Sequence, residues 1–180
     1  MIHERLEETR RARPLVRVER DTVEPGAAAT GYVVAVGPEF FLLQLVADDI
    51  NFDGFQAMRI AHLTTLEAPH DHVEFIERAL EARGSNAPPI PAVDVTSLRS
   101  LLVSAGQAFR LVTIHRELIE PDACHIGAIE FANDEAVRLR EIGPDAEWDE
   151  EIEEYALDDI TRVDFGGRYE EALLLVAGAG

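Results

Sequence analysis

The sequence contains no lysine, only one cysteine and no long apolar segment. Its 16 basic residues, all arginines, stand against 35 acidic residues and give a formal net charge of −19. Nucleic-acid binders attract phosphates with excess positive charge, so this balance argues against general nucleic-acid binding. A single cysteine, Cys124, excludes an internal disulfide, and no apolar run approaches the roughly 18 residues of a membrane span. Residues 1–14 are charged throughout, unlike a secretory signal. We therefore expect a soluble, cytoplasmic protein with no membrane partner.

The chain matches itself when it is shifted by 96 residues. Identical residues then coincide, together with the spacing of the apolar residues, at these pairs: Val16 and Val112, Arg20 and Arg116, Glu24 and Glu120, Pro25 and Pro121, Gly31 and Gly127, Glu39 and Glu135, Leu43 and Leu139. One residue inserted after Asp149 changes the shift to 97, at which Thr64 matches Thr161. This pattern indicates an internal duplication, and we predict copies at residues 1–84 and 94–180 joined by a linker at 85–93.

Each copy has the pattern of a helix, five short strands and a second helix. The predicted strands cover 15–18, 31–36, 40–46, 55–60 and 63–66 in the first copy, and 111–114, 127–131, 136–140, 152–157 and 160–163 in the second. A helix at 96–108, with Asp94 or Thr96 as N-cap, would bridge the copies. Closure into a small barrel removes the open edges of such short strands. The expected fold is mainly β with flanking helices, in two tandem five-stranded barrels.

Each copy resembles the Sm-like branch of the SH3-type barrels. The resemblance depends on Gly31 and Gly127 at the start of the second strand, on the turn Asn133-Asp134-Glu135, and on the segment 155–163. It implies a barrel in each copy. The tandem arrangement resembles that of bacterial chains of unassigned activity. The Arg-Gly pair of Sm-like RNA binders is absent, since Arg59 precedes Ile60 and the second copy has Ala156 there. The resemblance therefore implies a fold without an RNA site.

The densest group of charges lies between the third and fourth strands of the second copy. It includes Asp145, Glu147, Asp149, Glu150 and Glu151, and the aromatic residue among them is Trp148. These carboxylates are too dense to bury, so they form either a solvated hairpin tip with Trp148 packed inward or a docking surface with Trp148 as its aromatic anchor. We expect a non-enzymatic interaction or adaptor protein that uses this surface to bind an unidentified, basic protein.

The alternative function is RNA binding by an arginine cluster near the N-terminus. Its candidate residues, which would have to share one face, are Arg5, Arg10, Arg11, Arg13 and Arg17. An enzyme would need acid and base groups from both copies to converge at the cleft between them. The sequence identifies no such set, so we expect no catalytic residue.

Two short histidine segments are considered as metal or thiol sites. His70 and His72 flank Asp71, but residues two apart on a helix point to different sides, and Asp71 is the expected helix cap with both histidines exposed. Cys124 and His125 are adjacent in an extended segment and point to opposite sides, which favours a partly buried, structural cysteine. We expect neither a metal nor a cofactor. The repeated Arg20 with Glu24, and Arg116 with Glu120, are expected to form local ion pairs.

Overall fold

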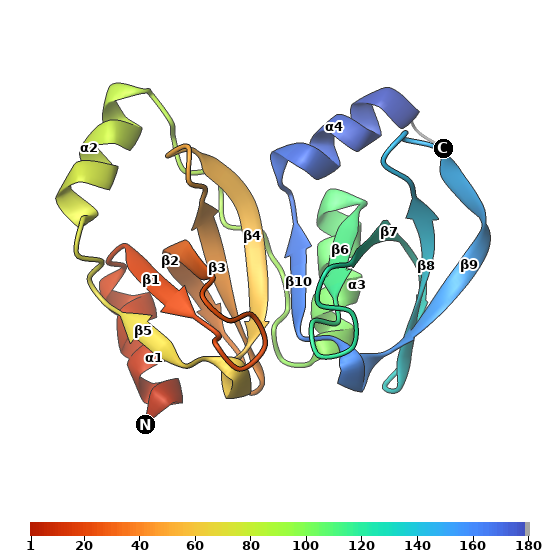
Figure 1. Ribbon diagram of the computed structural model, residues 1–180, viewed down its shortest axis with the longest axis horizontal. Helices are drawn as coiled ribbons and strands as arrows, with labels where there is room; N and C mark the ends of the chain where they lie inside the picture. Colours follow the sequence, from red (N-terminus) through yellow and green to blue (C-terminus); the bar gives the residue numbers. More distant parts are fainter. Residues whose placement is uncertain (179–180) are drawn as a thin grey trace.

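The computed structural model describes residues 1–178 as two halves with the same order of elements (Figure 1). The first half consists of α1 (Ile2–Ala12), β1 (Val16–Glu19), β2 (Ala28–Val36), β3 (Phe40–Val46), β4 (Phe52–Arg59), η1 (Ile60–His62), β5 (Thr65–Glu67) and α2 (Val73–Ala82). The second consists of α3 (Leu98–Phe109), β6 (Val112–His115), β7 (Cys124–Ala132), β8 (Ala136–Ile142), β9 (Trp148–Ala156), η2 (Leu157–Asp159), β10 (Arg162–Phe165) and α4 (Arg168–Ala177). The bounds repeat at nearly the same spacing as the identical residues.

The ten strands form one open antiparallel sheet. Their order is β5-β1-β2-β3-β4-β10-β6-β7-β8-β9, so the last strand of each half pairs with the first strand of that half. The predicted pair of closed five-stranded barrels is not shown. Closure within the first half would require β5 to pair with β4, but the free edge of β4 pairs with β10 of the second half instead. The mainly β fold with flanking helices is confirmed.

The junction between the halves is a short antiparallel ladder. Phe55 lies opposite Phe165, and Met58 lies opposite Arg162. The Arg59 side chain crosses the junction, where its Nε donates to the Ile160 carbonyl at 2.7 Å and its Nη2 to the Leu157 carbonyl at 3.0 Å. The two halves are therefore joined by main-chain pairing as well as by side chains.

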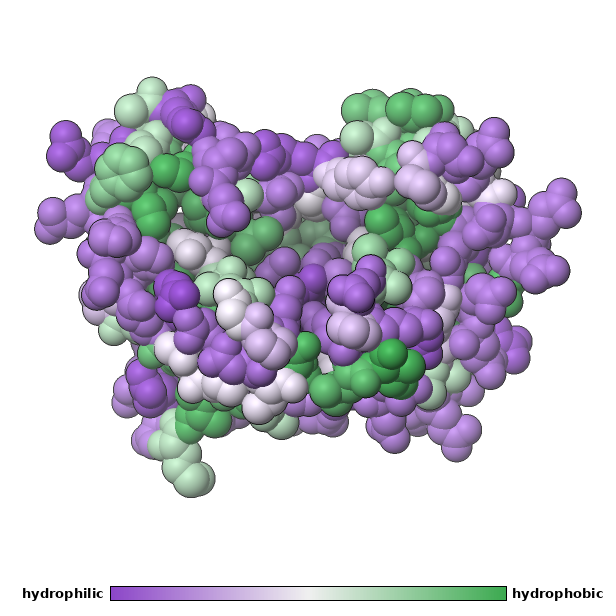
Figure 2. All heavy atoms as spheres, in the orientation of Figure 1, coloured by the Kyte–Doolittle hydropathy of each residue, from purple (hydrophilic) through white to green (hydrophobic). Residues whose placement is uncertain are grey.

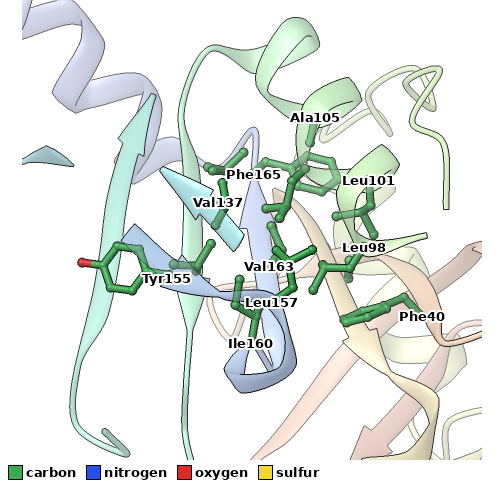
Figure 3. Close-up of a cluster of buried hydrophobic side chains, with 14 of the residues drawn as sticks. Phe40, Leu98, Leu101, Ala105, Val137, Tyr155, Leu157, Ile160, Val163 and Phe165 are labelled. Carbon is green, nitrogen blue, oxygen red and sulfur yellow. The ribbon is translucent and has the colours of Figure 1, made fainter. Parts of the chain in front are cut away.

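The largest hydrophobic cluster contains residues of both halves (Figure 3). Leu101, Leu102 and Ala105 on α3 are fully buried in it, together with Val163 of the second half. Phe40 of β3 belongs to the same cluster. The central helix therefore bridges the halves, as its apolar stripe predicts, although its N-cap is Ser97, whose side chain accepts a hydrogen bond from the Ser100 N–H.

A second cluster fills the first half beneath α1. Leu6 of α1 is fully buried there against Val16, Val33 and Phe41. The closing helices of the halves cover smaller clusters, with Leu80 of α2 in one and α4 in the other. Among the described residues, no helix is both long and apolar enough to span a membrane.

The repeated glycine near the start of β2 and β7 has a packing reason. A Cβ atom on Gly31 would lie 2.1 Å from the Gln44 carbonyl oxygen, and one on Gly127 would lie 2.5 Å from that of Arg140. The neighbouring strand thus passes too close for any side chain. The register shifts that follow also repeat, between Val33 and Ala35 in the first half and at the matching positions in the second.

Candidate interaction surface

Strand β9 forms one edge of the sheet, and no strand of the described chain pairs with its outer side (Figure 1). The six residues 149–154 are all exposed, whereas Tyr155 is 6% exposed and lies in the large cluster. On its other side β9 pairs with β8 from Ala136 opposite Ala156 to Ile142 opposite Trp148. The strand is therefore held in an extended form while its outer edge stays uncovered in the described chain.

The main-chain groups of β9 alternate between β8 and the open edge. The Leu157 N–H donates to the Glu135 carbonyl, and Tyr155 and Glu153 follow it at intervals of two in the ladder to β8. In an antiparallel pair the residues between them direct their N–H and C=O groups the other way. The N–H and C=O groups of Ile152 and Glu154 therefore face the open edge.

Seven carboxylates line this strand and the turn before it, and we call them the acidic surface. They are Asp145, Glu147, Asp149, Glu150, Glu151, Glu153 and Glu154. Within residues 1–178, the Glu154 carboxylate alone among them has an ion-pair partner, the Arg138 Nε at 2.7 Å. Asp145 Oδ1 accepts from the Glu147 N–H at 3.2 Å and fixes the turn. Hydrophilic side chains dominate this side of the molecule in Figure 2.

Trp148 packs inward rather than forming the exposed anchor of a docking surface. It contacts the cluster that contains Leu111, Ile142 and Leu173, and the Arg140 guanidinium lies 5.4 Å from its ring centroid. Phe52 at the matching position of the first half packs inward in the same way. The alternative interpretation from the sequence, a solvated hairpin tip with Trp148 packed inward, describes this partly buried tryptophan correctly.

Sequence reasoning missed the apolar part of the surface. Ile152 is 52% exposed on β9, and Phe131 on β7 is 49% exposed beneath the Arg138 guanidinium, at 5.6 Å from the ring centroid. The run of acids around Ile152 hides it in the sequence, and Phe131 lies 21 positions earlier in the chain. Only strand pairing brings Phe131, Arg138 and Glu154 into one row.

A buried ion-pair network lies at the junction of the halves. Arg20 is 3% exposed, and its Nη2 and Nη1 lie 2.6 and 3.1 Å from the two carboxylate oxygens of Glu117. Arg162 Nη1 contacts Glu24 at 3.0 Å and Glu117 at 3.3 Å. Burial by itself would raise the pKa of Glu117, but the hydrogen bonds from Arg20 and Thr161 and the charges of Arg20 and Arg162 lower it to about 2.

The repeated local ion pairs are confirmed, and one of them belongs to this network. Arg20 contacts Glu24 at 2.8 Å, and Arg116 contacts Glu120 at 2.7 Å. The cross-half partner Glu117 is not visible in the repeat, because its first-half match is the exposed Asp21. A cavity of about 300 Å³ adjoins the network and is lined by Arg20, Arg162 and residues of β1 to β4. Of the charged side chains in its lining, Arg20 and Arg162 both pair with Glu24.

A polar cluster in the second half connects β7, β8 and β9. The Tyr155 hydroxyl lies 2.9 Å from His125 Nδ1 and donates to Glu141, and His125 Nε2 lies 2.9 Å from Glu120. Burial and the hydrogen bond to Glu141 raise the pKa of Tyr155 above its ordinary value. The phenol is therefore held neutral, and the cluster fastens β9 to the rest of the half.

The remaining candidate residues are dispersed. Cys124 is exposed as a residue, whereas a partly buried cysteine was expected, and it lies opposite His115 in the ladder. Neighbouring atoms still shield its thiol partly from water, and this desolvation and the charge of Asp164 raise the pKa of the thiol. A raised pKa disfavours the reactive thiolate. His70 is buried rather than exposed, and His72, not Asp71, is the N-cap of α2. In the part of the chain described, no three His, Cys, Asp or Glu side chains are grouped as a metal site requires.

The N-terminal arginines do not form a free basic face. Arg5 donates to the Leu66 carbonyl at 2.9 Å, Arg10 pairs with Glu7 at 3.0 Å, and Arg17 pairs with a strand neighbour, Glu19. Arg11 and Arg13 are exposed, but α1 also carries Glu4, Glu7 and Glu8. The arrangement does not favour the RNA-binding alternative.

Comparisons with protein-family models, with curated proteins and with solved structures found no match for the chain.

Proposed function

We propose that this protein is a non-enzymatic interaction or adaptor protein that binds a basic protein through the acidic surface. We also propose that each half is a Sm-like unit, because the element order, the repeated glycine and the turn after β2 agree with that resemblance. The observation that carries the function is the row of exposed carboxylates on an open sheet edge. Six of the seven have no ion-pair partner among the described residues, so they are available to cations of another molecule.

The position of these carboxylates favours a role in binding over a role in general solubility. Residues 149–154 are consecutive and exposed on one strand, and the polar cluster around Tyr155 together with the packed Trp148 holds both ends of the strand. A fixed strand presents its charges in a constant geometry, which lowers the entropy lost when a partner binds. A merely solubilising charge would need no such order.

The test is recovery of partners by the purified protein from the cells in which it occurs. One variant combines Glu147→Gln, Asp149→Asn, Glu150→Gln and Glu151→Gln; it should fold normally and no longer bind the partner. Binding of the partner by the wild-type protein should weaken as the salt concentration rises. A matched control, Glu8→Gln with Asp71→Asn, Glu74→Gln and Glu81→Gln, removes four exposed carboxylates elsewhere and should keep the partner. Equal recovery by both variants would reject the proposed function.

A further inference from the structure

Strand β9 has a direct structural counterpart whose edge is already occupied. Its match in the first half is β4, and β4 accepts β10 as an antiparallel neighbour from Phe55 opposite Phe165 to Met58 opposite Arg162. The same edge of β9, from Ile152 to Tyr155, has no neighbouring strand in the described chain. The molecule thus contains one filled and one open example of the same edge.

We infer that the open edge of β9 binds an extended basic segment of another protein as an added antiparallel strand, in the register that β10 takes on β4. This inference rests on the proposed function and specifies how the acidic surface would bind. Strand addition joins main-chain hydrogen bonds to side-chain recognition at alternate positions. The main-chain groups of Ile152 and Glu154, which face the open edge, would supply the hydrogen bonds.

The strand register at the junction predicts which residue types the added strand needs at each position. Asp164 of β10 lies opposite Gln56, whose matching residue on β9 is Glu153, and Val163 lies opposite Ala57, whose match is Glu154. An acidic residue opposite Glu153 would be repelled, whereas lysine or arginine opposite these two glutamates would be attracted. Phe165 lies opposite Phe55, whose match is Ile152, so an apolar residue fits there.

A second copy of this chain does not fit the same edge. Its β5 is the match of β10, and in this register Glu67 would lie opposite Glu153. Two β9 strands paired with each other would place glutamates opposite glutamates. The side chains next to the open edge also differ between the two halves. Leu42 and Ala57, which are buried at the junction, are matched in the second half by Arg138 and Glu154, which form an exposed ion pair. The charge pattern therefore favours a basic strand from a different protein.

The main-chain contacts at the junction make the inference testable with a peptide. The Arg59 N–H donates to the Thr161 carbonyl, so in this ladder the residues at the positions of Val163 and Phe165 direct their N–H groups toward the partner strand. In the peptide GSTRKVKKG, the residues T, R, K and V would then face Tyr155, Glu154, Glu153 and Ile152. The R and V residues would donate to β9, and the N–H groups of T and of the first K would point away.

The experiment measures binding of this fluorescently labelled peptide to the full chain by anisotropy at low salt. N-methylation of R and V removes both donors without changing charge, and it should weaken binding at least about ten-fold. N-methylation of T and the first K, the matched control, should leave binding unchanged. Equal binding by both methylated peptides, or no binding by the unmethylated peptide, would overturn strand addition. The pull-down with the charge-neutralised variant tests the proposed function independently of the mode of binding.

A protein variant tests the same edge with every carboxylate in place. Ile152→Pro removes an N–H that does not pair with β8, and proline is tolerated on the solvent side of an edge strand. It should weaken peptide binding at least about ten-fold, whereas Ile152→Ala should change it less than about three-fold, because it keeps the N–H. Circular dichroism and thermal unfolding check the fold of both variants. A dimer of the wild-type protein that Ile152→Pro abolishes would assign the edge to a second copy and overturn the inference.

Discussion

The Arg20 guanidinium and the Glu117 carboxylate form a bidentate ion pair that joins the two halves of the chain. The two contacts measure 2.6 and 3.1 Å, and both side chains are at most 5% exposed. Thr161, directly before β10, also donates to Glu117. The pair therefore lies where the first half meets the strand that continues its sheet.

Loss of the Glu117 charge should destabilise the protein strongly. Glu117→Gln leaves the Arg20 guanidinium buried with only Glu24 as an acidic partner, and breaking such a buried pair costs about 3 kcal/mol or more of unfolding free energy. The control is Asp21→Asn at the matching, exposed position, which should cost less than about 1 kcal/mol. Urea unfolding of the two variants measures the difference. Similar losses for both would show that the cross-half pair contributes little.

The same residue gives stability a defined dependence on pH. The pKa of Glu117 is about 2 in the folded protein against an ordinary value of 4.5. The folded state thus binds this proton more weakly than the unfolded chain does, so the stabilisation is complete above about pH 4.5 and disappears as the pH falls toward 2. It amounts to about 3 kcal/mol. Unfolding free energies at pH 7, 4 and 3 should converge for the wild-type protein and Glu117→Gln; a constant gap would contradict this account.

Gly31, near the start of β2, should tolerate no side chain. In Gly31→Ala the new methyl group would lie 2.1 Å from the Gln44 carbonyl oxygen, so the strands would have to separate, at a cost of about 3 kcal/mol or more. Gly106→Ala is the control. There the nearest atom is the end of the Ile129 side chain at 3.2 Å, and alanine favours the helix, so stability should change by less than about 1 kcal/mol. Thermal unfolding of both variants compares the two sites.

Trp148 should affect stability rather than partner binding. Trp148→Ala removes packing against Leu111, Ile142 and Leu173, so we expect a loss of about 2 to 3 kcal/mol in unfolding free energy. Trp148→Phe keeps an aromatic ring and should bind the basic peptide as the wild-type protein does. A ten-fold loss of peptide affinity in a folded Trp148→Phe protein would show that Trp148 takes part in binding.

The repeat and most of the strands could be predicted from particular residues. The strand at 40–46 has the predicted bounds, and most other strands shift by one to four residues at an end. The start of β9 was missed because Asp149 to Glu151 have the composition of a loop, whereas the structure places them in β9 between Trp148 and Ile152, which both pair with β8. For Trp148 the sequence left two interpretations open, inward packing or an exposed anchor, and only the structure shows the packing against Leu111, Ile142 and Leu173.

The candidate site was predicted in part. The run from Asp145 to Glu151 identified the acidic turn, because charge at that density is visible without coordinates. Ile152 and its open main-chain groups were not identified, because the main-chain groups of a strand are the same whether or not a neighbouring strand covers them. Glu117 was missed for a related reason: its partner Arg20 lies 97 positions away, across the junction of the halves.

The sequence by itself determined that the chain has two matching halves, since repeated glycines and apolar spacing encode local backbone shape and the inner face of each strand. Only the tertiary structure decided that the halves share one open sheet. The main-chain N–H and C=O groups at a strand edge are the same for every residue type except proline. The residues of β4 and β10 therefore do not predict that these two strands pair. The strand order also leaves the outer edge of β9 without a neighbour in the described chain, and we propose that the charges around this edge select its partner.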